Sequence, residues 1–202
     1  MKETGMLFKP EMIRAINEDR KTQTRRLIKP QPPEEANSYL IGIDSLAGQF
    51  KFVDTFNTLY AMTPFIKCPY GRKGDLLWVK EGFVELVCNE IGQLVYGGPY
   101  IPPRTFVIYK ADEKNPKDYL WKSPLFMPKK YARLWLELTA DPIPQRVQEI
   151  TEEDAKAEGA EHSPIGITYR TCFRVIWDSI NKKTPWTTNP WAWKLEFKKI
   201  ER

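Results

Sequence analysis

Two segments that alternate between apolar and mostly polar side chains constrain the fold more than any other feature of the sequence. Residues 132–139 read Ala-Arg-Leu-Trp-Leu-Glu-Leu-Thr, and residues 191–198 read Trp-Ala-Trp-Lys-Leu-Glu-Phe-Lys. Successive side chains of a strand point to opposite faces of a sheet, so each segment predicts a strand with one face in a core. Residues 76–79 and 105–110 predict two further strands, because they are rich in β-branched, aromatic and other apolar side chains.

Short helices are expected between these strands. Pro10 suits the first turn of a helix over residues 10–18, since its missing N–H would be unpaired there. Residues 151–154 form a variant of the capping box and Gly159 is placed to end the helix that follows. Apolar residues at helical spacing predict another helix over residues 169–181. Short strands interspersed with short helices favour an α+β fold built on a small β-barrel.

The chain is expected to form one domain. Its 202 residues suffice for one core, and a second full domain would be tight. Hydrophobic residues make up 42% and charged residues 28%, which is typical of globular proteins and argues against disorder. Residues 1–202 are therefore assigned to a single domain. The irregular stretch at about 34–69 is interpreted as an insertion that packs on it.

Several classes of site and location are disfavoured by what the sequence contains. His162 is the one histidine and is expected in a solvated loop, which disfavours a histidine metal site or a Ser-His-Asp triad. The three cysteines form no C-x-x-C pair, and neither a P-loop nor a G-x-G-x-x-G motif is present, so we expect no metal and no cofactor. No apolar run has the length of a membrane span, and no signal peptide is recognisable. We therefore expect no membrane partner and a cytoplasmic location; the oligomeric state is left open.

The densest polar cluster is Lys21, Thr24, Arg25 and Arg26. Lys21 and Thr24 share a face only if this segment is a helical or coiled turn, because on a strand their spacing of three would separate them. A lysine of lowered pKa could then take the proton of a nucleophilic threonine, and a carboxylate such as Glu81 could assist. The alternative is structural: Thr24 begins a strand, Lys21 and Glu81 form an ion pair, and the arginines lie on a solvated face.

Five segments together resemble the ASCH family of the PUA-like superfamily, especially its phage-associated branch. They are Lys21–Arg26, Gly74–Glu81, Tyr109–Asp112, Met127–Pro128 with the strand that follows, and Asn189–Trp193. The usual signature of that family is G-x-K-x-x-E-x-R. Lys21 and Arg26 match it, whereas Asp19 stands at the glycine position and Thr24 at the glutamate position. The resemblance implies a PUA-like β-barrel with flanking short helices.

The Thr24 departure is shared by ASCH amidohydrolases that act on N4-acetylcytidine without a metal or cofactor. By resemblance, Thr24 would be the nucleophile, Lys21 its base and Glu81 the carboxylate partner. Substrate contacts are expected from Arg25, Arg26, Trp78, Lys80 and Tyr109. The alternative is a non-catalytic module that binds RNA or a modified pyrimidine nucleoside, which the net charge of +5 and the aromatic share of 13% also suit. A third possibility, a ribonuclease, lacks a visible acid–base pair.

Overall fold

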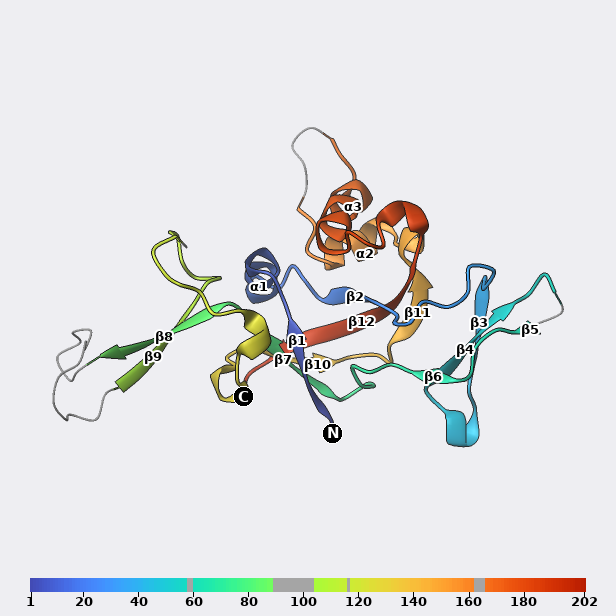
Figure 1. Cartoon of the computed structure of the whole chain (residues 1–202), viewed down its shortest axis with the longest axis horizontal. Helices are drawn as coiled ribbons and strands as arrows, with labels where there is room; N and C mark the ends of the chain where they lie inside the picture. The colour runs from blue at the N-terminus through green and yellow to red at the C-terminus, as the bar shows by residue number, and fades with distance from the viewer. Residues whose placement is uncertain (58–59, 89–103, 116, 162–165) are drawn as a thin grey trace.

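The main sheet of the computed structural model has six strands (Figure 1). The structure describes residues 1–57, 60–88, 104–115, 117–161 and 166–202. The order along the sheet is β1 (Glu3–Leu7), β7 (Leu76–Lys80), β10 (Trp135–Leu138), β12 (Trp191–Ile200) and β11 (Ile143–Arg146), while β2 (Gln23–Leu27) also pairs with β12. Only β1 and β7 run parallel among these pairs of the described chain. The sheet curls into a half-barrel, so the predicted α+β class is confirmed.

A second sheet lies at one end of the molecule and a hairpin at the other (Figure 1). The second sheet comprises β3 (Ser38–Ile41), β4 (Gln49–Asp54), β5 (Tyr60–Ala61) and β6 (Ile66–Lys67), and the hairpin comprises β8 (Phe83–Cys88) and β9 (Arg104–Tyr109). The ring of Phe52 lies 4.9 Å from that of Trp191, and Phe50 lies 5.4 Å from Trp193. Residues 34–69 therefore contribute to the main core although they form their own sheet.

The helices begin and end where local sequence signals place them. They are α1 (Pro10–Asn17), α2 (Glu152–Ala157) and α3 (Tyr169–Ile180), with 3₁₀ turns η1 (Asp44–Leu46), η2 (Pro124–Phe126), η3 (Lys129–Tyr131), η4 (Val147–Glu149) and η5 (Trp186–Thr188). The Thr151 hydroxyl accepts a hydrogen bond from the Asp154 N–H, and Gly159 takes a φ of +82° after α2. These are the cap and stop that were predicted, so this helix and the helix after Pro10 are confirmed.

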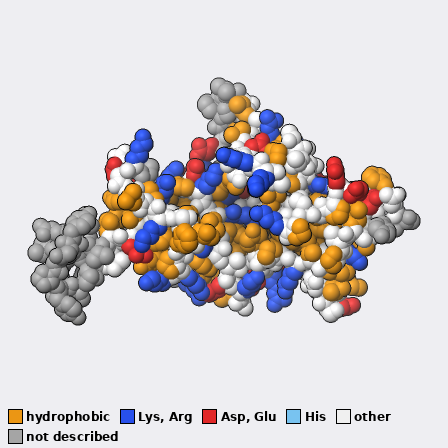
Figure 2. Space-filling view, in the orientation of Figure 1, with side chains coloured by type: hydrophobic (Ala, Val, Ile, Leu, Met, Phe, Trp, Pro, Cys, Tyr) orange, Lys and Arg blue, Asp and Glu red, His pale blue; other side chains and the backbone are white. Residues whose placement is uncertain are grey.

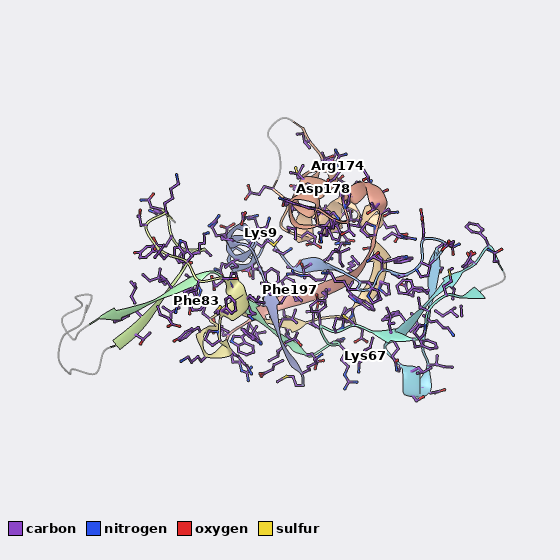
Figure 3. All side chains as sticks on the ribbon, viewed as in Figure 1. Lys9, Lys67, Phe83, Arg174, Asp178 and Phe197 are labelled. Carbon is purple, nitrogen blue, oxygen red and sulfur yellow. The ribbon has the colours of Figure 1, made fainter. Side chains whose placement is uncertain are left out.

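Two apolar clusters hold the elements together. The larger one lies inside the half-barrel and includes Leu136, Leu138, Leu195 and Phe197 from β10 and β12. The smaller one joins α2, α3 and η4, and Trp177 is its largest side chain. Lys9, labelled beside α1 in Figure 3, donates to the Ser179 hydroxyl at 3.1 Å and so links α1 to α3 above the sheet.

One predicted strand is shorter than expected. The segment 132–139 forms β10 only from Trp135 onward, because η3 turns the chain just before it. Trp135 was placed on the polar face, yet it is 8% exposed. The Lys129 ammonium and the Arg202 guanidinium lie over its ring at 5.5 and 4.3 Å, which explains how an outward-facing indole is covered. His162 lies outside the described residues.

Candidate functional site

Lys21 is held in a buried polar network. Its backbone forms a β-bridge with Glu158. Its Nζ donates to Glu158 Oε2 at 2.8 Å, to the Glu158 carbonyl at 2.7 Å and to the Gln23 carbonyl at 2.8 Å. An ammonium has three donors and no acceptor, so these contacts use every N–H of Lys21. Burial lowers the pKa of Lys21, while the charge of Glu158 acts in the opposite direction. In this geometry the Lys21 ammonium is ion-paired with Glu158 and all its N–H groups are hydrogen-bonded, so it is not a free base.

Arg25 shares the same carboxylate as Lys21. Its Nη1 donates to Glu158 Oε1 at 3.2 Å and its Nη2 to Asp154 Oδ2 at 2.7 Å. Burial acts to raise the pKa of Asp154, but the hydrogen bond from Lys194 and the charge of Arg25 outweigh it and hold that pKa below its ordinary range. Asp154 lies in α2, and Glu158 is the residue that caps its C-terminal end. The Lys21–Arg25–Asp154–Glu158 network therefore fixes α2 on β2.

Thr24 and Arg26 lie on the opposite face of β2 from this network. In the pairing with β12, Thr24 stands opposite Leu195 and Arg26 opposite Trp193. Paired residues of neighbouring strands share a face, and those two β12 side chains are in the main core. Thr24 is accordingly 3% exposed.

The segment Lys21–Thr24 does not form the helical or coiled turn that a shared face for these two side chains would require. The N–H of Thr22 donates to the Ala157 carbonyl at 2.8 Å, and the Thr22 carbonyl accepts from Phe197 at 2.9 Å. These long-range backbone bonds hold the segment extended. At a spacing of three, an extended backbone sends the Lys21 and Thr24 side chains to opposite sides. The structural alternative for Thr24, a residue on a strand, matches the geometry.

Glu81 belongs to a different cluster from Lys21. Its carboxylate is buried and receives both arms of Arg133, from Nε at 2.9 Å and from Nη2 at 3.0 Å. Arg133 also pairs with Asp112 and lies 4.0 Å from the centre of the Tyr109 ring. Burial raises the pKa of Glu81 while the hydrogen bonds from Arg133 act to lower it. The expectation that Glu81 partners Lys21 is corrected here, because the carboxylate paired with Lys21 is Glu158.

The remaining predicted contact residues are also separated. Trp78 and Lys80 alternate with Leu77 and Val79, which are buried in the core, so they face outward from β7. The Lys80 ammonium lies 5.3 Å from the Trp78 ring and donates to the Leu125 carbonyl at 2.6 Å. Tyr109 lies beside Glu81 and Arg133. Arg25 is paired with Asp154 and Glu158 in the buried network. The structure thus does not gather the predicted residues into one site.

Of the eight residues predicted for the site, Arg26 is the one that lines a cleft beside the end of β2. This cleft of about 660 Å³ lies between the end of β2, the loop after it, the second sheet and the end of α3. Its walls carry three cations and, among the described residues, no carboxylate. The lining residues are Arg26–Pro32, Phe52, Thr63, Pro64, Ile66, Lys67, Pro69, Tyr70, Asn181 and Trp193.

Arg26 enters this cleft with a hydrogen-bond donor to spare. Its Nη2 donates to the Leu7 carbonyl at 2.6 Å and its guanidinium lies 4.9 Å from the Phe8 ring. Its Nε is buried without a hydrogen-bond partner. An unpaired buried donor costs about 1–3 kcal/mol, so this position of Arg26 is not optimised for the stability of the fold. Burial also lowers the pKa of Arg26, and a guanidinium stays charged through such a shift.

Sequence reasoning assigned to a site none of the other lining residues, among them the polar Lys29, Lys67, Tyr70 and Asn181. Lys29 had a signal, because it opens the run Lys-Pro-Gln-Pro-Pro directly after β2 and a proline-rich loop holds such a side chain at a fixed place. Lys67, Tyr70 and Asn181 had none, since their approach to β2 depends on how distant segments pack. Figure 3 labels Lys67 on β6, at the side of the molecule away from the helices.

Comparisons of the chain with protein-family models, with curated proteins and with solved structures found no match. Among the described residues, no helix combines the length and apolar character that crossing a membrane requires. The same part of the chain holds no cluster of three or more His, Cys, Asp or Glu side chains placed to bind a metal ion. The geometry of the cleft is therefore what bears on function.

Proposed function

We propose that this chain is an ASCH-like module that binds RNA or a modified pyrimidine nucleoside in the cleft beside Arg26. The observation that carries the proposal is the charge of the cleft: Arg26, Lys29 and Lys67 line it and no described carboxylate does. A surface that carries only positive side chains attracts anions such as phosphate. The match of Lys21 and Arg26 to the ASCH signature supports the same conclusion.

The walls of the cleft also suit a nucleobase. Tyr70 is half-buried there and is the lining aromatic ring with exposed surface, because Phe52 and Trp193 beneath it are buried in the core. Aromatic rings bind single-stranded bases by stacking, and a guanidinium can donate to a base edge or a phosphate with fixed geometry. Arg26 contributes a guanidinium that makes no ion pair within the described chain. A ligand that combines a flat ring with an acceptor-rich or anionic group would satisfy both features.

The test measures binding of cytidine, N4-acetylcytidine and cytidine monophosphate by titration calorimetry. Arg26→Lys keeps the charge and removes the fork, so we expect a loss of about 1.5–3 kcal/mol, or about 10- to 150-fold in affinity. Lys67→Gln removes an exposed cation of the same cleft and should weaken the monophosphate more than the nucleosides.

Arg174→Lys is the matched control, because Arg174 is exposed on α3 (Figure 3) and lines neither the Arg26 cleft nor the three other hollows described in this chain. It should bind as the original chain does. Affinities unchanged in both Arg26→Lys and Lys67→Gln, with all three proteins folded, would refute a ligand site in this cleft.

Hydrolysis of the amide of an N4-acylated cytidine is a second candidate function. One observation favours it: burial lowers the pKa of Lys21, which is the direction that a general base requires. The filled hydrogen bonds of Lys21 and the position of Thr24 on the other face of β2 weigh against it. Incubation with N4-acetylcytidine, followed by chromatography for cytidine, tests for this hydrolysis. If the original chain hydrolyses the amide and Thr24→Ala does so equally well, Thr24 takes no part in the reaction.

A further inference from the structure

A second hollow continues the Arg26 cleft toward the end of α3. It measures about 390 Å³ and is lined by Leu27–Lys29, Gln31 and Ile180–Thr184. Five of these residues also line the first cleft: Leu27, Ile28, Lys29, Gln31 and Asn181. The two hollows therefore form one groove that crosses the end of β2, with the second sheet on one side and the end of α3 on the other.

The groove carries one sign of charge along its whole length. Its cations are Arg26, Lys29, Lys67, Lys182 and Lys183, and no Asp or Glu lines either hollow among the described residues. Within the described chain, no ion pair involves any of the five. In Figure 2, Lys and Arg side chains gather near the middle of the visible face and acidic ones are sparse there.

Two other hollows of the described residues differ from the groove in carrying both signs of charge. The cleft between α1 and α3 is lined by Lys9, Arg14 and Arg20, but Glu11, Glu18, Glu158 and Glu161 line it too. The hollow beside α2 likewise mixes both signs. Mixed charges neutralise each other at short range, whereas a row of unpaired lysines attracts a chain of phosphates.

From this continuity we infer that the ligand is a single-stranded nucleic acid chain: one base occupies the Arg26 cleft, and the phosphates next to it follow the groove past Lys29 to Lys182 and Lys183. The inference rests on the proposed function and names its substrate class. A single strand is required because a base paired in a duplex cannot enter a cleft without leaving its stack. A free nucleoside would leave the lysines at the end of α3 without a role.

The test compares a ten-nucleotide RNA with cytidine monophosphate on the full chain and on Lys182→Gln/Lys183→Gln. We expect the double substitution to weaken the RNA and leave the monophosphate unchanged. Each lysine–phosphate contact adds about 0.7 to the salt slope of single-strand binding, so the slope should fall by about 1.4. That change corresponds to a loss roughly 60-fold greater at about 50 mM than at about 1 M salt.

The matched control is Lys114→Gln/Lys117→Gln, which removes the same charge from two exposed lysines after β9 that line neither hollow of the groove. It should retain most of the RNA affinity and salt slope. Monophosphate bound as tightly as the strand would overturn the inference while leaving the nucleoside cleft intact. Equal losses in the two double variants, or equal binding of a duplex, would also overturn it. A chain that binds neither RNA nor monophosphate would instead remove the proposed function itself.

Discussion

Replacing Lys21 with alanine should destabilise the fold, because Lys21 is a buried ion-pair partner. The substitution leaves the Glu158 carboxylate with Arg25 as its remaining cation, at 3.2 Å, and deprives two carbonyls of their donor. Removing one partner of a buried pair costs about 3–5 kcal/mol. A substitution in an exposed cleft, the situation implied by a catalytic Lys21, would cost no more than about 0.5 kcal/mol. The two interpretations thus differ by several kcal/mol.

Urea and thermal denaturation, each monitored by tryptophan fluorescence, measure this difference in the free energy of unfolding. A loss of about 3–5 kcal/mol should lower the Tm by about 6–20 °C in a chain of this size. Lys73→Ala, at an exposed lysine in a turn, is the control and should change the free energy of unfolding by less than about 0.5 kcal/mol. In a cycle with Glu158→Gln, the double variant should lose about 0.5–3 kcal/mol less than the two single losses added together. Additive losses, or a Lys21→Ala chain as stable as the original, would refute the buried-pair interpretation.

Three further predictions concern stability. The folded-state pKa of Asp154 is held below its ordinary value, so the stability it contributes is present above about pH 4 and is lost as the pH falls through the folded pKa; Asp154→Asn should flatten the acid side of a stability–pH profile, and an unchanged profile would contradict this. Phe52→Ala should cost about 3–5 kcal/mol and lower a single calorimetric transition, because Phe52 packs on Trp191; a separate early transition for the second sheet would count against one cooperative core. Asp19→Val should destabilise by about 1–2 kcal/mol, since Asp19 has a φ of +55° that a β-branched residue tolerates poorly; equal stability would mean that the turn rearranges.

The helices α1, α2 and α3 and the strands β7, β9, β10 and β12 were predictable because their signals are local. Pro10, Thr151 and Gly159 act within one helical turn of their own position, and the helices begin and end beside them. The alternation of residues 191–198 predicted β12 and its buried face for the same reason. Asp19 takes a φ of +55°, a conformation that aspartate adopts more readily than most residues.

The contacts of the predicted site were not predictable, because each depends on a residue far away in the sequence. Glu158 is 137 positions from Lys21, and Arg133 is 52 positions from Glu81. The chain has 26 acidic residues, and nothing local says which of them a given lysine will meet. Long-range pairing of residues 22–27 with β12 also overrode the turn that the polar composition allowed. Sequence reasoning singled out the polar segment Lys21–Arg26 but could not assign its partners.

The neighbours Arg25 and Arg26 show how one strand separates a structural role from the ligand-binding role proposed for Arg26. Alternation along β2 sends Arg25 beneath α2, where Asp154 and Glu158 neutralise it. The same alternation sends Arg26 to the other face, where its hydrogen bond goes to an uncharged carbonyl and its Nε remains unpaired. A cation paired with two carboxylates attracts a further anion only weakly, because its charge is already neutralised. A cation without a carboxylate partner keeps its full attraction for an anionic ligand. Where charge remains uncompensated after folding is therefore a better guide to the ligand site than the density of basic residues in the sequence.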